Sequence, residues 1–169
     1  FAFITALRAE FDGIICVGGG IADGAALAGA IAAGADLVYM GTRFLAAEES
    51  MAVPGYKQMV VDSGIEDLVV SPAITGTPAS WLIPSLVACG YDPKDLGKPA
   101  TRDYGGDPHA KWKDLWAAGQ GVGTVRSVEP VSVSRRRITS QTGIVAVAPP
   151  CTAIETWRPS SAKHWRLRA

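Results

Sequence analysis

Two short runs of consecutive apolar residues, 14–17 and 37–40, flank an alanine-rich segment. An unbroken apolar run of this length is typical of a strand buried on both faces of a parallel sheet. The intervening residues 24–34 have a helical composition, with Asp23 placed to cap the first turn and Gly34 to end the last. The pattern therefore predicts a strand–helix–strand unit with a right-handed crossover.

Mainly helical periodicity follows, interrupted by stretches rich in glycine and proline. Helices are predicted at 2–11, 44–49, 54–63, 80–90 and 111–118, a short strand at 68–70, a loop at 92–108 and an extended segment at 124–133. From Ser134 onward the periodicity fades. We therefore expect residues 134–169 to form a tail with little order.

Composition and charge refine this picture. The chain has 169 residues, 48% of them hydrophobic and 19% charged, which indicates a globular domain. Its formal net charge is zero, although the Pro- and Trp-containing segment 134–169 is basic. No apolar run is long enough to cross a bilayer, and we expect neither a membrane nor a nucleic acid as a partner.

The three cysteines give information on compartment and metal binding. Cys16, Cys89 and Cys151 are widely spaced and form no Cys-x-x-Cys pair. This spacing argues against a disulfide framework and a metal site, and it favours a reducing, cytoplasmic compartment. Cys16 lies within the first apolar run, so we expect it to be a small core residue.

Both apolar runs end in glycine, and this repetition suggests a phosphate site. Gly18, Gly19 and Gly20 follow the first run, and Gly41 follows the second. Glycine amides at a strand end can approach an anion closely because no side chain stands in the way. Two such turns on neighbouring strands predict a phosphate clamp of the kind that the last two strands of a (β/α)₈ barrel provide.

Two other glycine-rich sites fit less well. A dinucleotide fingerprint would need a third glycine where Asp23 stands, and an acidic residue after the second strand, whereas Asp36 precedes it. A P-loop would need Gly-Lys-Ser/Thr, which is absent from these segments. The monophosphate clamp remains the favoured interpretation.

The glycine-rich segments resemble those of the nitronate monooxygenase family. The resemblance is carried by Gly-Gly-Ile-Ala-Asp-Gly at 19–24 and Met-Gly-Thr-Arg-Phe-Leu-Ala at 40–46, and it continues at 48–50, 74–76, 82–86 and 118–123. It covers residues 2–133 and implies an FMN-dependent (β/α)₈ barrel. Residues 1–133 would then be the C-terminal part of that barrel, with its last two strands and helices, followed by a mostly helical region and the irregular tail 134–169.

The resemblance also implies a cofactor, a reaction and a set of binding residues. The cofactor would be FMN, and the reaction would be oxidation of an alkyl nitronate by molecular oxygen. The residues at the phosphate would be Gly19, Gly20, Tyr39, Met40, Gly41 and Thr42. Arg43 could lie near the phosphate or be a surface ion-pair partner, and the 119–123 loop could be structural or contact the ligand. We expect Trp112 and Trp116 to be core anchors.

Part of the family pattern has no counterpart in this sequence. A (β/α)₈ barrel takes about 250 residues, and neither His109 nor His164 matches the family's catalytic base, so no catalytic residue is assigned. We expect the isolated chain to be inactive. A flavin-dependent NAD(P)H:quinone or enoyl reductase, and a truncated, catalytically silent fragment, remain the alternatives.

Overall fold

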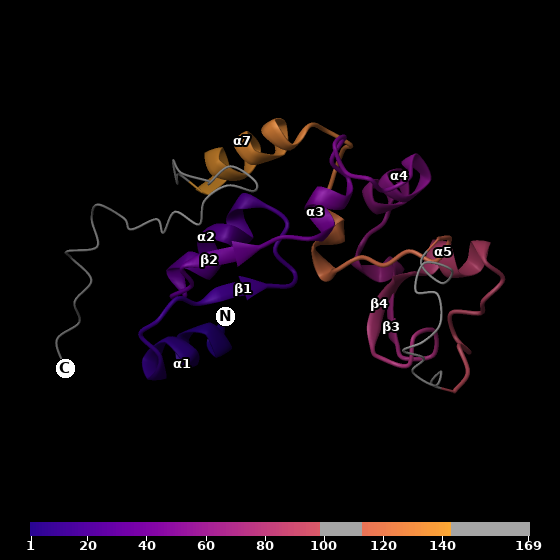
Figure 1. The fold of residues 1–169 in the computed structure, drawn as a ribbon, viewed down its shortest axis with the longest axis horizontal. Helices are drawn as coiled ribbons and strands as arrows, with labels where there is room; N and C mark the ends of the chain where they lie inside the picture. The colour runs from indigo at the N-terminus through magenta and orange to yellow at the C-terminus, as the bar shows by residue number, and fades with distance from the viewer. Residues whose placement is uncertain (99–112, 143–169) are drawn as a thin grey trace.

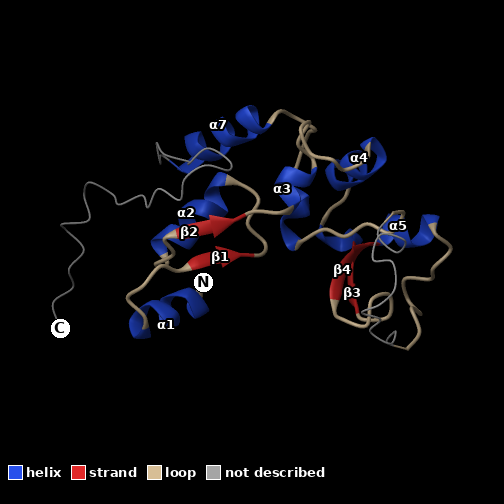
Figure 2. Cartoon of the chain, viewed as in Figure 1, coloured by secondary structure: helices blue, strands red, loops and turns tan. Residues whose placement is uncertain are grey.

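A computed structural model describes residues 1–98 and 113–142 of the chain, which form two groups of elements (Figure 1). The first group contains α1 (Ala2–Glu10), β1 (Cys16–Gly18), α2 (Gly24–Ala32), β2 (Leu37–Tyr39) and α7 (Val131–Thr142). The second contains α4 (Pro54–Asp62), η1 (Ile65–Asp67), β3 (Leu68–Ser71), β4 (Ala79–Leu82) and α5 (Ile83–Ala88). Between them lie α3 (Thr42–Leu45) and η2 (Gln120–Thr124). The colouring of Figure 2 shows one strand pair in each group.

The predicted strand–helix–strand unit is confirmed. β1 and β2 pair in parallel, with Val17 opposite Val38 and Gly18 opposite Tyr39. The Asp23 carboxylate accepts a hydrogen bond from the Ala26 amide at 2.8 Å and so caps α2. The described part of the chain is therefore an α/β structure that begins with a parallel βαβ unit.

The prediction that the first strand is buried on both faces is wrong. Val17 and Val38 pack towards Ile4 and Ala30, whereas Cys16 is exposed and is not the core residue that its apolar neighbours predicted. Among the described residues, β1 and β2 pair only with each other. Helices cover the face that carries Val17 and Val38, whereas Cys16 and Tyr39 on the opposite face are exposed, so that face is bare. An apolar run indicates which side chains a strand tends to bury, but tertiary contacts decide which faces of the sheet are covered by other elements.

The first three residues of the helix predicted at 80–90 form a strand instead. β4 pairs antiparallel with β3, which includes the strand predicted at 68–70, and only residues 83–88 are helical. Trp81 and Leu82 are completely buried, and the Leu82 amide donates to the Trp116 carbonyl at 2.9 Å. Pairing on both sides of β4 outweighs the local helical pattern.

The same pairing overturns the helix predicted at 111–118. Residues 113–118 contain no helix; the Ala118 amide donates to the Ser80 carbonyl at 3.2 Å, and Ala117 forms a β-bridge with Trp81. Trp116 packs against the core and stacks on Tyr56 with ring centroids 5.2 Å apart. Trp112 and most of the loop predicted at 92–108 lie outside the described residues.

The prediction of low order from residue 134 is wrong for residues 134–142. They belong to α7, which begins at Val131 and so also shortens the extended segment predicted at 124–133. Ser134 and Ile138 are buried one helical turn apart, although most of α7 is polar. A buried face made of one serine and one isoleucine gives too little apolar signal to stand out in the sequence. Residues 143–169 lie outside the described part.

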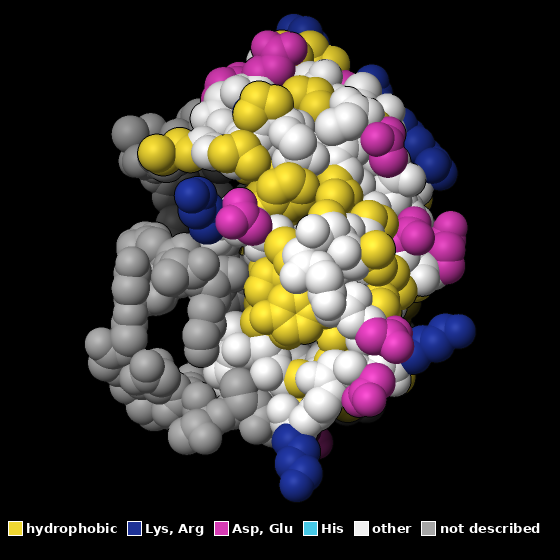
Figure 3. All heavy atoms as spheres, turned by 90° about the vertical axis from the view of Figure 1, so that its right-hand side faces the viewer, with side chains coloured by type: hydrophobic (Ala, Val, Ile, Leu, Met, Phe, Trp, Pro, Cys, Tyr) yellow, Lys and Arg dark blue, Asp and Glu magenta, His cyan; other side chains and the backbone are white. Residues whose placement is uncertain are grey.

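Figure 3 shows the face of the molecule on the right-hand side of Figure 1. Apolar side chains gather near its centre, and both acidic and basic side chains are spread around them. This face therefore shows no concentration of basic groups. No helix in the described part of the chain has the length and apolar character that crossing a bilayer requires.

Candidate functional site

The structure places the two predicted glycine turns side by side. Gly18 and Tyr39 are opposite each other in the parallel ladder, so the turns at 19–22 and 40–41 leave the same end of adjacent strands. Neighbouring strands lie about 4.8 Å apart. Gly19 and Gly20 have φ values of 97° and 69°, in the left-handed region that favours glycine.

The backbone at these turns is open to a ligand. A Cβ atom added at Gly19, Gly20 or Gly41 would meet no atom within 4 Å. Within the described residues, the amides of Gly20 and Gly41 donate to no backbone or side-chain acceptor. Exposed, unpaired amides from two adjacent turns fit the acceptor oxygens of a phosphate.

The segment Gly119–Gly121 forms a third wall of the site. The Gly119 amide donates to Thr42 Oγ1 at 2.8 Å, and a Cβ at Gly121 would lie 2.7 Å from the Ala22 Cβ and 3.3 Å from the Gly20 carbonyl oxygen. The segment thus contacts both turns. The Thr42 hydroxyl accepts from Gly119 and keeps its own hydrogen for a further acceptor.

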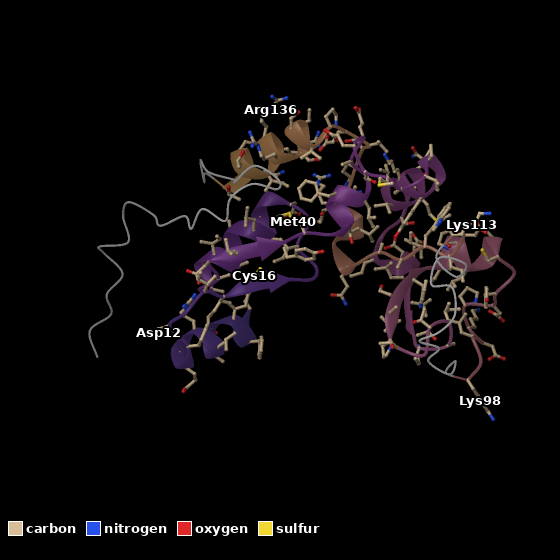
Figure 4. The ribbon with its side chains drawn as sticks, in the orientation of Figure 1. Asp12, Cys16, Met40, Lys98, Lys113 and Arg136 are labelled. Atoms are coloured by element: carbon tan, nitrogen blue, oxygen red, sulfur yellow. The ribbon has the colours of Figure 1, made fainter. Side chains whose placement is uncertain are left out.

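Tyr39 and Met40 differ in exposure. Tyr39 is 72% exposed on the bare face of the sheet, and Met40 is partly buried at the end of β2 that leads to α3 (Figure 4). All six predicted binding residues therefore lie at one end of the β1–β2 pair. Their contact with a ligand remains a prediction.

Arg43 lies behind the site, where sequence reasoning left its role open. Only 2% of its surface is exposed, and its Nη1 is 3.9 Å from Glu129 Oε1. Burial lowers the pKa of its guanidinium, while Glu129 and Asp23 oppose that change. Its Nε and Nη1 atoms have no hydrogen-bond acceptor among the described residues, so Glu129 supplies compensating charge rather than a hydrogen bond.

Glu129 is a residue that the sequence analysis missed. Its carboxylate accepts hydrogen bonds from Ser134 at 2.7 Å and Ser127 at 3.1 Å, and it pairs with Arg137 Nη2 at 2.8 Å. Burial alone would raise the pKa of Glu129, but these hydroxyl donors and the two arginines lower it below its ordinary value. One signal was available: Glu129 is the only acidic residue between Asp114 and Glu155.

The described residues provide no alternative metal centre. They contain no group of three His, Cys, Asp or Glu side chains placed to hold an ion. Both histidines, His109 and His164, lie outside the described part, and no catalytic base is assigned. The adjoining turns are the best-defined candidate site that this part of the chain offers.

Sequence comparisons identify a family and two curated relatives. The family model described as nitronate monooxygenase matches residues 14–103. The chain is 34% identical over 101 residues to a nitronate monooxygenase of Paraburkholderia phytofirmans and 31% identical over 113 residues to a probable nitronate monooxygenase of Staphylococcus saprophyticus. These matches cover 60% and 61% of this chain but only 27% and 32% of the relatives.

Solved structures agree with this similarity. FabK from Thermotoga maritima, as its M276A mutant, matches with a TM-score of 0.59 at 29% identity, over 83% of this chain and 44% of that one. A nitroalkane oxidase from Streptomyces ansochromogenes matches with a TM-score of 0.62 at 25% identity, over 84% and 43% of the two chains. The arrangement of the described elements is thus shared with part of each of these larger chains.

Proposed function

The chain belongs to the nitronate monooxygenase family, and from that premise we propose that its paired glycine turns hold the phosphate of FMN. The observation that carries this proposal is the placement of unpaired Gly20 and Gly41 amides at the same end of two paired strands. A flavin phosphate is a dianion that needs several donors, and these turns supply them without a side chain in the way.

The proposed binding residues fall into phosphate donors and residues that position a turn. The Gly20 and Gly41 amides donate to phosphate oxygens, and the Thr42 hydroxyl adds a third donor while Gly119 fixes its oxygen from the other side. Tyr39 and Met40 set the end of β2 from which this turn leaves. Bound flavin would supply the redox chemistry, whereas the described residues anchor and orient it.

We place β1 and β2 as the last two strands of a (β/α)₈ barrel. Support comes from their parallel pairing, from the α2 crossover, and from the rule that phosphate sites lie at the ends of strands 7 and 8 in such barrels. We further propose that the whole protein oxidises alkyl nitronates with molecular oxygen. Oxygen consumption with a nitronate, compared with NADH oxidation in the presence of a quinone, separates this reaction from that of a reductase.

The binding proposal is tested with FMN and riboflavin, which differ by the phosphate. The chain labelled with ¹⁵N is titrated with each flavin while its backbone amide signals are followed by NMR. We expect FMN to shift the Gly20, Gly41 and Thr42 signals and riboflavin to leave them nearly unchanged. Equal shifts with both flavins, or no shifts at these residues, would contradict a phosphate site.

Gly41→Ala offers a variant that keeps the fold. A Cβ at Gly41 meets nothing within 4 Å and φ is −99°, so the methyl group fills only the space above the amide. We expect FMN binding to weaken about fivefold, which corresponds to roughly 1 kcal/mol. Gly123→Ala is the matched control because its Cβ would make only ordinary contacts, at 3.8 and 3.9 Å, with the backbone of residues 64 and 65.

A further inference from the structure

Glu129 connects the elements that support the two glycine turns. Only 6% of its surface is exposed, and its carboxylate interacts with groups from α3, from α7 and from its own loop. No role in binding the phosphate has been proposed for this carboxylate, but its contacts lead towards both glycine turns.

The first connection leads to the Gly41 turn. Arg43 follows Thr42 directly in α3, and its guanidinium is buried beside Glu129. The backbone of Glu129 adds a second link, because its carbonyl accepts from the Glu48 amide at 3.1 Å just after α3. A buried guanidinium that lost its counter-charge would be costly to keep in this position.

The second connection leads to the Gly19–Gly20 turn through α7. Ser134 and Arg137 of α7 both bind the Glu129 carboxylate. At the other end of the same helix, Gln141 Oε1 accepts from the Gly24 amide at 3.0 Å, at the start of α2. In Figure 1, α7 lies along α2. Arg136 lies on the outer side of α7 and points away from α2 (Figure 4).

We propose that Glu129 is a positioning residue for the flavin phosphate, because it ties the supports of both turns together behind the site. The proposal rests on the proposed FMN function. Glu129 touches no ligand atom itself; it acts by holding Arg43 and α7, which fix where the two sets of amides point. Its loss should therefore weaken binding of FMN, which has the phosphate, far more than binding of riboflavin.

The test compares two buried serines. Ser134→Ala removes a hydrogen bond to Glu129, and Ser85→Ala removes hydrogen bonds to Asp114 and Trp116 in the other group of elements. Both residues are 1% exposed, so each change removes buried hydrogen bonding, and urea unfolding of both variants measures what each change costs in stability. A general loss of stability would affect both variants alike, whereas a positioning effect would appear only in Ser134→Ala.

Glu129→Gln completes the set of variants. The ¹⁵N-labelled chain and each variant are titrated with FMN and with riboflavin, and the Gly20 and Gly41 signals are followed. Residues that hydrogen-bond to the ligands of a metal ion, without touching the ion, typically change its affinity by about tenfold or more when they are replaced. By analogy, we expect FMN binding to weaken about tenfold in Glu129→Gln. The loss in Ser134→Ala should be smaller. Ser85→Ala should bind FMN like the unaltered chain. The small changes that riboflavin causes in the Gly20 and Gly41 signals should be the same in the unaltered chain and in every variant.

The outcomes separate the two proposals. If the unaltered chain does not distinguish FMN from riboflavin, the proposed function fails, and the role of Glu129 fails with it. If the unaltered chain distinguishes them and both Glu129→Gln and Ser134→Ala do so equally well, only the positioning role is overturned. A loss in Ser85→Ala as large as in Ser134→Ala also overturns it. Should Glu129→Gln fail to fold, the two serine variants still decide.

Discussion

Two buried side chains of opposite charge, Arg43 and Glu129, lie behind the glycine turns. Glu129 and Arg43 form the most buried pair of opposite charges in the described part of the chain, yet their atoms are 3.9 Å apart. The carboxylate obtains its hydrogen bonds from Ser127, Ser134 and Arg137. Because Nε and Nη1 of Arg43 have no hydrogen-bond acceptor among the described residues, its burial depends on the charge of ionised Glu129.

This arrangement predicts an acid-sensitive stability. The pKa of Glu129 in the folded chain lies below its ordinary value of 4.5, so ionised Glu129 favours the folded state. That contribution is complete above the pKa of the unfolded chain and is lost as pH falls through the lower folded pKa. Protonation would also leave Arg43 and Arg137 facing a neutral group, with Asp23 the remaining carboxylate near Arg43.

We therefore expect Glu129→Gln to be less stable than the unaltered chain at pH 7, and this difference to shrink as the pH falls below the ordinary carboxyl pKa of 4.5. Urea unfolding midpoints measured from pH 7 downward check the prediction. Glu48→Gln, at an exposed position, controls for the loss of one negative charge. A difference between the Glu129 variant and the unaltered chain that stays constant with pH would argue against this account.

At the scale of elements, the contact between α7 and α2 supports one side of the candidate site. Gly24 is the first residue of α2 and follows the Asp23 cap, and its amide donates to Gln141 of α7, which lies alongside α2. A Cβ atom at Gly24 would lie 2.3 Å from the Ile138 carbonyl oxygen and 2.5 Å from the Gln141 Cβ. Glycine is needed here for close approach of two backbones, although its own conformation is an ordinary helical one.

Gly24→Ala should consequently destabilise the chain, because the methyl group overlaps backbone that cannot move alone. The expected loss is roughly 1–3 kcal/mol in the free energy of unfolding, measured with urea. Gly29→Ala in the same helix is the control: its methyl group would meet mainly the ring of Phe1, which is 70% exposed and free to move. The control should be neutral or gain up to about 1 kcal/mol from helix propensity.

At the scale of the whole molecule, the candidate site lies where the two groups of elements meet. The turns come from the β1–β2 unit, whereas Gly119–Gly121 follows the strand-like segment that pairs with β4. A core cluster joins the groups, with Ala22 beside the first turn and Val60 and Leu82 from α4 and β4. The second group thus closes the site, although neither of its own strands contributes a predicted binding residue.

The extent of the site predicts how tightly this chain holds flavin. Its described residues offer donors for a phosphate, and the chain spans about a third or less of its curated relatives. We expect FMN to bind with a dissociation constant of roughly 0.1–1 mM, or about 4–5.5 kcal/mol. The purified chain should be colourless near 450 nm. Stoichiometric flavin after gel filtration would contradict this expectation.

Three local features were predictable from the amino-acid sequence: the parallel βαβ unit, the Asp23 cap and the glycine turns that identified the family. Each depends on residues close together in the chain, whose conformational and hydrogen-bonding preferences can be recognised directly. The other features depend on contacts between residues far apart in the chain. It made a strand of residues 79–82, ordered α7 and left one face of the β1–β2 sheet bare. It also joined Arg43 to Glu129, because burial and pairing over long separations outweigh local propensity.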